Sequence, residues 1–594
     1  MYRAPQRELR FVMDELVPAE RLAGLYADVD YSGELGASVV EEAAKFAENV
    51  LAPLNRAGDE EGARWTPEGV RMPKGFPEAY ARYMEGGWPQ LGLGAEHGGQ
   101  GMPQLLGSAV EEVLFAANMG FYLCPSLTKG AVEAVSHAAS EELKSRVLPH
   151  LVSGEWAGTM NLTEPQAGSD LSLIKTRAVP DGQGTYRIFG QKIFITFGDH
   201  DMTSNIAHLV LARIDGAPAG NAGISMFWVP KCIPNADGSP GEPNDVRALS
   251  IEHKLGIHAS PTCVMAYGEK QGALGWLVGE ANTGLATMFI MMNAARLSVG
   301  VQGLAQSERA TQQALDWARN RKQGRVPGEK SEGPVAIIRH PDVKRMLLTM
   351  KSLTEAMRYL AYTAAAELDF AHREGDESAR DAARVRAELL TPVVKGWNTE
   401  TAVRVASLGV QVHGGMGYVE ETGAAQTLRD ARITSIYEGT TAIQSNDLVG
   451  RKVGRDAGQG LANLVAQLRE QLDTGSSDAT VAAVRESAGR ALDLLIATGA
   501  AVLREHGTAP ARALAVSVPF LELCGTVIGG ALHARAAGIA ANALAAGSGD
   551  SDFYRAKIET ARFYAAHVLP MATSLAAIVT GGAESVTAAE PARW

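Results

Sequence analysis

The chain contains few cysteine residues, and these are far apart. Its 594 residues include four cysteines, namely Cys124, Cys232, Cys263 and Cys524, and no CxxC pair. This spacing argues against a disulfide framework and against a zinc site, so we expect no bound metal. It also indicates a reducing compartment, and we expect a cytoplasmic protein.

Two nucleotide-binding sequences are also missing. The chain has no GxGxxG and no GKS or GKT, which argues against a Rossmann dinucleotide fingerprint and against a P-loop. Basic residues are in the minority, and the net charge of −12 argues against non-specific binding to nucleic acid or to an anionic membrane surface. The N-terminal sequence MYRAPQRELRF lacks the apolar core of a signal peptide.

One long run, residues 563–583, carries no formal charge and has to be considered as a membrane span. It contains His567, Pro570 and the pair Gly581-Gly582. These residues favour a buried helix of a bundle, so we expect no membrane span.

The length of the chain exceeds one ordinary hydrophobic core and predicts about three or four domains. Helical spacing of apolar residues predicts helices at 38–51, 76–86, 105–118, 141–151, 286–319, 342–374, 379–408 and 424–432, and a helical block at 461–583. A loop rich in Gly, Pro and charge is expected between the first two helices, up to about residue 75.

Strand-like runs occupy the middle of the chain, at 156–162, 186–196, 208–214, 224–230, 262–267 and 276–278. No helix of crossover length separates them, which predicts an antiparallel sheet. We therefore expect an N-terminal extension (1–35), a helical domain (36–155), a β-domain (156–283), a helical bundle domain (284–455) and an additional C-terminal helical domain (456–594).

The sequence RITSIYEGTTAIQ holds one carboxylate, Glu438, between Tyr437 and Gly439. A glycine after the acid lets backbone approach a ligand, and apolar neighbours raise the pKa of a carboxyl towards the range of a general base. The alternative is an ordinary helix N-terminus, with Thr440 or Thr441 as the cap and a solvated Glu438.

Two further sequences end predicted strands of the β-domain: NLTEPQAGSD at 161–170 and FITFG at 194–198. Their hydroxyls and backbone N–H groups suit the rim of a flat heteroaromatic ring, and Phe194 suits its face. The alternative is a pair of ordinary β-turns. The glycine-dense QVHGGMG at 411–417 could approach a phosphate or an adenosine, or form a plain turn between helices. RKQGR at 321–325 could hold a pyrophosphate or form a solvated face, and Arg296 could be a structural ion-pair partner.

Together with ARLSVGVQGLAQSERA at 295–310, these motifs resemble the acyl-CoA dehydrogenase family over residues 40–455, in the family's order. The phrases YRIFGQKIFIT, GDHDMTSNIAHLVLAR and IHASPTCVMAYG are most similar to its four-domain group that acts on 3-methylthiopropionyl-CoA. The resemblance implies an α+β multidomain protein with the acyl-CoA dehydrogenase fold: an N-terminal helical domain, an antiparallel β-barrel-like domain and a four-helix bundle, here with an extra C-terminal helical domain.

The resemblance also implies a reaction. FAD would lie between the β-domain and the bundle domain, and an acyl-CoA thioester would be oxidised to the trans-2-enoyl-CoA. Glu438 would remove the α-proton, while the flavin ribityl hydroxyl and the Glu438 N–H stabilise the enolate oxygen. A short acyl chain such as 3-methylthiopropionyl is expected, with electron-transferring flavoprotein as the acceptor.

The residues implied for FAD are Leu162, Thr163, Ser169, Phe194, Thr196, Arg321, Gln411, Gly414, Gly415 and Thr440. Those implied for the substrate are Ser169, Asn293, Arg296, Tyr437 and Gly439. Arg321 and Gln411 usually act from a neighbouring subunit, which implies a homo-oligomer. The extra C-terminal domain should cover the surface that smaller relatives use as tetramers, so we expect a dimer.

Four residues differ from those usual in the family: Phe194, Asn293, Gln323 and Ala442. Three other functions stay open at this point: a medium- or long-chain dehydrogenase of β-oxidation, an acyl-CoA oxidase, and a flavin-binding relative that is associated with nucleic acid or assembly. The acidic balance and the retained Glu438 favour a dehydrogenase over the last of these.

Overall fold

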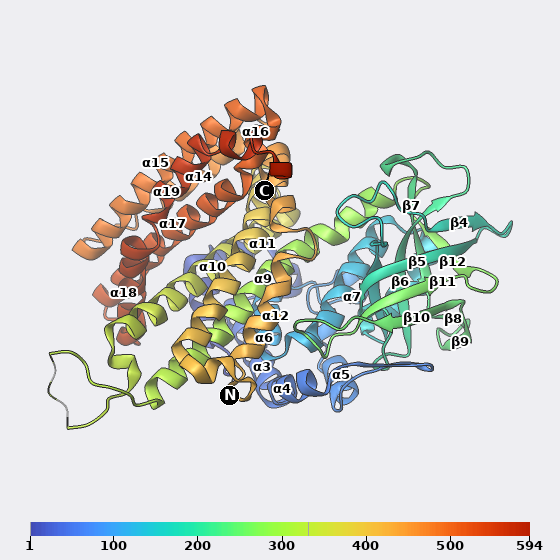
Figure 1. Cartoon of the computed structure of the whole chain (residues 1–594), viewed down its shortest axis with the longest axis horizontal. Helices are drawn as coiled ribbons and strands as arrows, with labels where there is room; N and C mark the ends of the chain where they lie inside the picture. The colour runs from blue at the N-terminus through green and yellow to red at the C-terminus, as the bar shows by residue number, and fades with distance from the viewer. Residues whose placement is uncertain (1, 329, 331, 594) are drawn as a thin grey trace. The chain divides into compact units, whose positions relative to one another are not determined.

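The computed structural model describes residues 2–328, 330 and 332–593 (Figure 1). The chain divides into two compact units. One unit, here called the helical unit, contains the residues up to 41, residues 103–116 and those from 296 onward; the other, the β-unit, contains 42–102 and 117–295. Each is described by itself.

The β-unit is built on an eight-stranded sheet in the order β10-β11-β5-β12-β7-β6-β3, with β4 beside β5 and β6. Two-stranded ribbons, β1-β2 and β8-β9, accompany it. The strands are β1 Arg64–Thr66, β2 Gly69–Arg71, β3 Trp156–Asn161, β4 Arg177–Pro180, β5 Tyr186–Thr196, β6 Asn205–Ile214, β7 Ile224–Pro230, β8 Cys232–Pro234, β9 Pro240–Pro243, β10 Val246–Ile251, β11 Thr262–Tyr267 and β12 Ala273–Val278.

The prediction of a wholly antiparallel sheet is wrong at two pairs. β3 runs parallel to β6, with Trp156 opposite Asn205, and β4 runs parallel to β6, with Arg177 opposite Arg213. The connection from β3 to β6 contains β4 and β5 in place of a helix. A parallel pair needs a long connection, and strands can supply that length as well as a helix does.

Helix α7 (Met119–Ala138) lies directly against β3. A Cβ at Gly158 would lie 2.4 Å from the Cβ of Ala131, and the Gly158 N–H donates to Thr128 Oγ1 at 3.0 Å. The sheet's core includes Trp156 and Trp228, whose rings stack with centroids 6.2 Å apart. This packing fixes the end of β3, from which the sequence TEPQAGSD continues.

The helices of the β-unit are α4 Ala52–Glu61, α5 Phe76–Glu85, α7 Met119–Ala138 and α8 Glu141–Ser153. The loop expected up to residue 75 is therefore wrong over α4. Pro53 and the charged residues suggested a loop, but Pro53 lies in the first turn of α4, where no backbone N–H is needed. Helix α7 was not predicted; it is buried along most of its length and contains Pro125.

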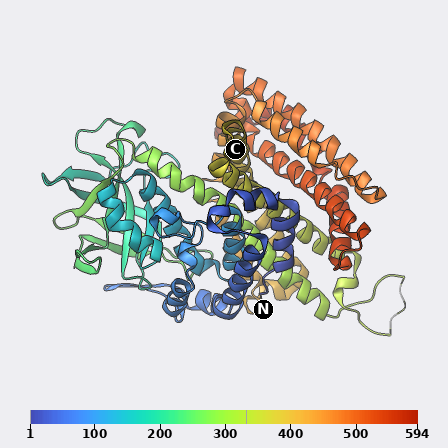
Figure 2. The same ribbon diagram turned by 180° about the vertical axis from the view of Figure 1, so that it is seen from behind.

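The helical unit contains the helical bundle and a C-terminal block of helices (residues 459–587). Its helices are α1 Gln6–Arg10, α2 Ala19–Leu25, α6 Gln104–Ala117, α10 Pro341–Arg373, α11 Glu377–His413, α12 Ala424–Arg432, α13 Thr441–Asp447, α14 Gln459–Gln471, α15 Ala479–Thr508, α16 Pro510–Ala515, α17 Ser517–Ala545, α18 Ser551–His567, α19 Met571–Gly581 and α20 Ala583–Thr587. Two helices, α3 Gly33–Phe46 and α9 Gly284–Asn320, pass from one unit into the other. Figure 2 shows the N-terminal helices in dark blue and the C-terminal block in orange to red.

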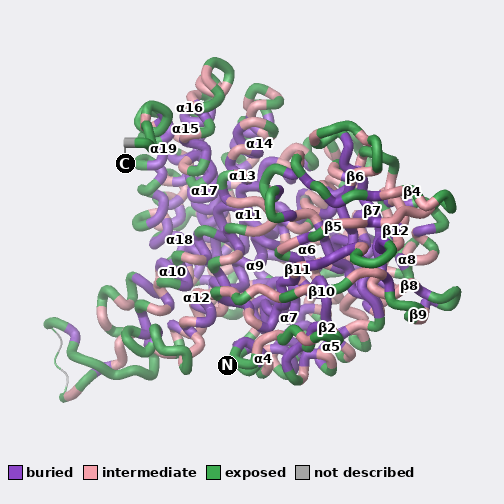
Figure 3. The backbone as a smooth tube through the Cα atoms, turned by 45° about the vertical axis from the view of Figure 1, so that its right-hand side comes forward, coloured by how far each residue is buried: buried purple, intermediate pink, exposed green. Residues whose placement is uncertain are grey.

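Small residues let α9 and α11 approach each other closely. A Cβ at Gly300 would lie 2.4 Å from Val394 Cγ1, and one at Gly303 would lie 3.0 Å from the Asn398 carbonyl oxygen. The facing parts of these helices are buried, as Figure 3 shows in purple. This contact sets the distance between the helix that carries Arg296 and the helix that carries Lys395.

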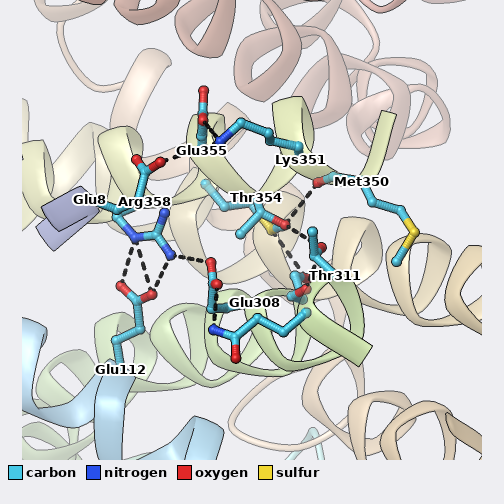
Figure 4. A network of polar contacts seen from close by, with 12 residues as sticks. Glu8, Glu112, Glu308, Thr311, Met350, Lys351, Thr354, Glu355 and Arg358 are labelled. Carbon is cyan, nitrogen blue, oxygen red and sulfur yellow. Dashed lines mark hydrogen bonds and ion pairs between the residues drawn. The ribbon is translucent and has the colours of Figure 1, made fainter. Parts of the chain in front are cut away.

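A buried network of charges joins segments that are far apart in the sequence (Figure 4). Arg358 of α10 pairs with Glu112 of α6 at 2.6 Å and with Glu308 of α9 at 2.7 Å. Glu8 of α1 accepts from Lys351 at 3.3 Å. The N-terminal extension thus packs on helices of its own chain.

Among the residues that the structure describes, three helical stretches have the length and mean hydropathy of a membrane span, at residues 284–320, 517–545 and 551–581. Within α17, 89% of the apolar window is buried inside the structure. The uncharged run 563–583 is divided between α18 and α19, which are separated near Pro570.

Candidate active site

Glu438 lies in a tight turn just before α13, here called the Glu438 turn (residues 437–440). Its φ is 54° and that of Gly439 is 89°. A left-handed conformation is uncommon for a residue with a Cβ and costs about 1–3 kcal/mol, so surrounding contacts have to hold it. Thr440 caps α13, since its Oγ1 accepts from the Ile443 N–H at 3.4 Å. The helix cap is therefore present, but Glu438 is half-buried rather than solvated.

The surroundings of Glu438 combine burial with positive charge. Burial raises the pKa of Glu438 above its usual value, while Lys395 and Arg296 act in the opposite direction. A carboxylate with a raised pKa suits a general base. Tyr437, which precedes it, donates its hydroxyl hydrogen to Gln302 Oε1 of α9.

Two side chains hold the carbonyl groups of the Glu438 turn. Lys395 Nζ donates to the Gly439 oxygen at 2.6 Å. Gln444 Nε2 lies 3.3 Å from the Glu438 oxygen and 3.4 Å from the Gly439 oxygen. Both side chains are buried. Neither side chain was predicted from the sequence to contact the turn; the available signal was a lysine within the apolar run of a predicted bundle helix.

Arg296 contacts the last residue of α13, Asp447. Its Nη1 lies 3.3 Å from Asp447 Oδ2, and both side chains are almost wholly buried. The interpretation of Arg296 as an ion-pair partner is thus correct, although its charge also acts on Glu438. Asn293 lies one turn earlier in α9, and its side chain is outside the described part of the structure.

In the β-unit, the residues implied for flavin contact gather at the end of β5. The Ile193 N–H donates to the Thr163 oxygen at 2.9 Å, and Thr196 pairs with Thr262. Phe194 has a φ of 59° and leaves 58% of its surface exposed. Such an exposed, strained aromatic residue presents a face for a planar ring.

A buried ion pair supports this group. Lys192 Nζ donates to the Leu162 oxygen at 3.0 Å and to Glu164 Oε1 at 2.8 Å. Glu164 also accepts from the Thr176 N–H at 3.0 Å. Glu164 was part of the quoted motif, but the sequence did not identify Lys192 as its partner. Ser169 lies on the exposed loop that follows Glu164.

The helix that precedes RKQGR contacts the helix in which QVHGGMG begins. Trp317 of α9 stacks on His413 of α11, with ring centroids 5.1 Å apart. Arg321 follows the first of these residues and Gln411 precedes the second, and both are exposed. At the following Gly414 and Gly415 (the former with φ 65°), an added Cβ would meet no described atom within 4 Å. The backbone there is open to a ligand or to another chain.

Comparison with known proteins gives four matches to family models. Residues 36–155 match the acyl-CoA dehydrogenase N-terminal domain and 159–268 its middle domain. Residues 282–453 match the acyl-CoA dehydrogenase C-terminal domain, and 463–590 match a domain described as acetyl-CoA dehydrogenase C-terminal like.

Curated relatives match almost the whole chain. A 3-methylmercaptopropionyl-CoA dehydrogenase of Ruegeria pomeroyi is 48% identical and is aligned over 96% of both chains. A butyryl-CoA dehydrogenase of Syntrophomonas wolfei is 35% identical over 96% of this chain and 95% of its own. The broad-specificity linear acyl-CoA dehydrogenase FadE5 of Mycobacterium tuberculosis is 35% identical over 97% of both.

Solved structures share the fold at lower identity. ACDH-11 of Caenorhabditis elegans, in complex with C11-CoA, has a TM-score of 0.74 at 22% identity, covering 96% of this chain and 92% of its own. An acyl-CoA dehydrogenase of Bacillus anthracis complexed with FAD has a TM-score of 0.74 at 21% identity, covering 94% and 91%.

Proposed function

Because the chain belongs to the acyl-CoA dehydrogenase family, we propose that it oxidises the Cα–Cβ bond of a short acyl-CoA thioester with Glu438 as the base. The observation that carries this assignment is the position of Glu438. It is the carboxylate of a strained turn, its pKa is raised by burial, and buried cations lie beside it. A structural carboxylate would not need this combination.

The reaction begins with removal of a proton from the carbon next to the thioester carbonyl. That proton is far less acidic than a carboxylic acid, so the developing enolate oxygen has to be stabilised by donors already in place. No described residue accepts a hydrogen bond from the Glu438 N–H, which leaves this group available as one such donor. The Glu438 carboxylate takes the α-proton and becomes neutral.

FAD is the cofactor of the family and, when bound, accepts the β-hydrogen as a hydride. The residues at the end of β5 fit a flavin: Phe194 offers an exposed face, and Thr163 and Thr196 offer hydroxyls. Gly414 and Gly415 leave room for backbone approach to the nucleotide half. In this proposal Leu162, Ser169, Arg321, Gln411 and Thr440 complete the FAD site, and Ser169, Asn293, Arg296, Tyr437 and Gly439 contact the substrate.

The proposed substrate is 3-methylthiopropionyl-CoA, with butyryl-CoA and similar short thioesters as alternatives. Two relatives that cover nearly the whole chain are named for short substrates of this size. A thioether sulfur is close in size to a methylene and only weakly polar, and one methylene discriminates by about 1–3 kcal/mol. We expect graded specificity. A kcat/KM optimum at a chain of twelve or more carbons would contradict the short-chain assignment.

The decisive test of the base is anaerobic bleaching of the yellow protein by a panel of acyl-CoA thioesters. Glu438→Gln should retain FAD but lose bleaching by at least about 100-fold, because the amide cannot accept the proton. Glu420→Gln is the matched control, since Glu420 is an exposed carboxylate that pairs with Arg429. Near-normal bleaching by Glu438→Gln would disprove the assignment.

The partners belong to the same proposal. Electrons would pass to electron-transferring flavoprotein, and rapid reoxidation by oxygen instead would identify an oxidase. The chain would act in the cytoplasm as a homodimer, with Arg321 and Gln411 contacting FAD of the partner subunit. Light scattering of the FAD-loaded protein tests the dimer, and either a monomer or a tetramer would contradict it.

A further inference from the structure

Lys395 is a buried cation that no motif of the sequence identified. It lies in the middle of α11 and has no exposed surface. Its ammonium group donates a hydrogen bond of 2.6 Å to the Gly439 carbonyl, next to Glu438. Burying an ammonium group costs free energy unless the group is paired with an opposite charge and hydrogen-bonded. The question is therefore what this turn gains from a lysine that a packed apolar side chain would not supply.

The packing around Lys395 brings α13 and α17 close to α11. A Cβ at Gly396 would lie 3.5 Å from the Gln444 Cβ and 2.8 Å from Leu521 Cδ1. The glycine thus accommodates Leu521, while the separation from Gln444 is an ordinary contact. The Gln444 side chain reaches the carbonyl groups of Glu438 and Gly439 alongside Lys395. Together the two side chains clamp the backbone at the two residues that have positive φ.

Charged side chains of both signs lie near the Glu438 turn. Burial lowers the pKa of Lys395 to about 8, and Glu438 and Glu400 act to raise it. Lys395 is thus a cation at neutral pH. The groups that face Glu438 are Lys395 from α11, Arg296 from α9 and the preceding Tyr437. Arg296 is already paired with Asp447, whereas the Lys395 ammonium contacts a carbonyl of the Glu438 turn itself.

We propose that Lys395 is a positioning residue for Glu438: its hydrogen bond to Gly439 fixes the left-handed turn, and its charge keeps Glu438 ionised. The inference rests on the proposed role of Glu438 as the base. The carboxylate must be negative before it accepts the α-proton, and it is neutral afterwards. A fixed cation favours the first state, and the hydrogen bond keeps the carboxylate aimed while its charge changes.

The test compares substitutions that separate packing, hydrogen bonding and charge. Lys395→Met keeps the length of the side chain and loses the donor and the charge, while Lys395→Arg keeps the charge. The kcat/KM of each FAD-loaded variant is measured for a short acyl-CoA across the pH range in which the wild type is stable. FAD content and melting temperature are recorded in parallel.

Lys395→Met should bind FAD, lose at least about tenfold in kcat/KM, and shift the acid limb of the profile upward by about one pH unit. The acid limb of Lys395→Arg should lie at the wild-type position, because this variant keeps the charge. A purely structural role would lower the rate at every pH without moving the limb, and that result would overturn the inference. If Lys395→Met does not fold, Lys395→Gln still loses the charge, so its limb must shift upward too.

Glu438→Gln, measured alongside, distinguishes an error in the role of Lys395 from an error in the assignment of Glu438 as the base. If it is inactive while the limb of Lys395→Met does not move, only the role of Lys395 is wrong. If Glu438→Gln is active, the proposed base is wrong and the inference about Lys395 falls with it.

Discussion

Arg296 and Asp447 form an ion pair within the helical unit, with Nη1 and Oδ2 3.3 Å apart and side chains only 7% and 8% exposed. Arg296 belongs to α9 and Asp447 ends α13, the helix that follows the Glu438 turn. Because the carboxylate of Asp447 offsets the guanidinium charge, less of that charge acts on Glu438. The two cations near Glu438 thus differ: Arg296 is paired with Asp447, whereas Lys395 donates a hydrogen bond to the Glu438 turn.

Asp447→Asn should have the opposite pH effect to Lys395→Met. With Asp447 neutral, less negative charge opposes Arg296, which lowers the pKa of Glu438, so the acid limb of kcat/KM should move to lower pH. The free energy of unfolding should fall by about 3–5 kcal/mol, because a buried ion pair is broken. Chemical denaturation and the pH profile measure the two effects.

Asp493→Asn is the matched control, since Asp493 is 73% exposed and pairs with Arg469 on the surface. It should change the free energy of unfolding by no more than about 1 kcal/mol. An acid limb of Asp447→Asn that moves upward would contradict the charge relationship described above.

Phe194→Gly should separate cofactor binding from fold stability. The φ of 59° at Phe194 is unfavourable for a residue with a Cβ, and glycine removes this cost of about 1 kcal/mol. The apoprotein should therefore melt no lower than the wild type. FAD binding should weaken roughly tenfold, because about 1–1.5 kcal/mol of stacking on the ring is lost. Fluorescence titration of the apoprotein with FAD measures this affinity.

Leu173→Ala provides the control for Phe194, because Leu173 is also an exposed apolar residue of the β-unit, at 60%. Its FAD affinity should equal that of the wild type. An unchanged affinity in Phe194→Gly would remove Phe194 from the flavin site.

The sequence predicted regular elements well where local pattern and long-range packing agree. The bounds of β5, β7, β11 and α12 coincide with the predicted runs, because alternating or helical apolar residues lie between clear turn residues. The sequence-based prediction failed where the structure depends on which distant segments pair with each other. The parallel pairing of β3 with β6 is set by the path of the chain between them, which no local pattern encodes.

The candidate site shows the same division. Glu438, Thr163 and Phe194 could be singled out because each stands in a recognisable motif. The positive φ of Glu438 and Phe194 could not, since neither is a glycine and surrounding contacts impose the conformation. Lys192 and Lys395 were missed because a sequence gives a residue but not the carbonyl or carboxylate that it meets in the fold.

Gly396→Ala should loosen the contact between the C-terminal block and the Glu438 turn. The new Cβ would lie 2.8 Å and 2.9 Å from the two methyl groups of Leu521 in α17. Such overpacking costs about 1–3 kcal/mol. Helix α17 also reaches α13 through Ser517, whose Oγ lies 2.9 Å from Ser445 Oγ. We therefore expect a lower melting temperature together with a lower kcat.

Gly507→Ala is the control, because a Cβ at Gly507 in α15 meets no described atom within 4 Å. It should be neutral or stabilising by up to about 1 kcal/mol. Combining Gly396→Ala with Leu521→Ala should recover part of the lost kcat by removing the clash. A double variant with no recovery would show that the C-terminal block does not act through this contact.

Lys557→Met should uncouple the N-terminal extension from the C-terminal block. Lys557 of α18 lies 3.0 Å from Glu355 Oε1 and also pairs with Glu8, and Lys351 lies 2.6 Å from Glu355 Oε1; Figure 4 shows Glu8, Glu355 and Lys351 close together. Burial alone would raise the pKa values of Glu8 and Glu355, but the two ammonium groups lower them below the usual 4.5. Both carboxylates are thus ionised in the folded protein.

The sign of the pH dependence follows from these lowered pKa values. Glu8 and Glu355 contribute their stability above about pH 4.5, the usual carboxyl value, and this contribution is lost as the pH falls through the lower folded pKa values. Lys557→Met should lose about 3–5 kcal/mol at neutral pH, because it leaves buried carboxylates with one cation fewer. Its free energy of unfolding should also depend less on pH in the acid range than that of the wild type. Lys45→Met, which breaks an exposed pair with Glu42, should do neither, and an acid dependence as steep as that of the wild type in Lys557→Met would show that these carboxylates do not control the acid stability.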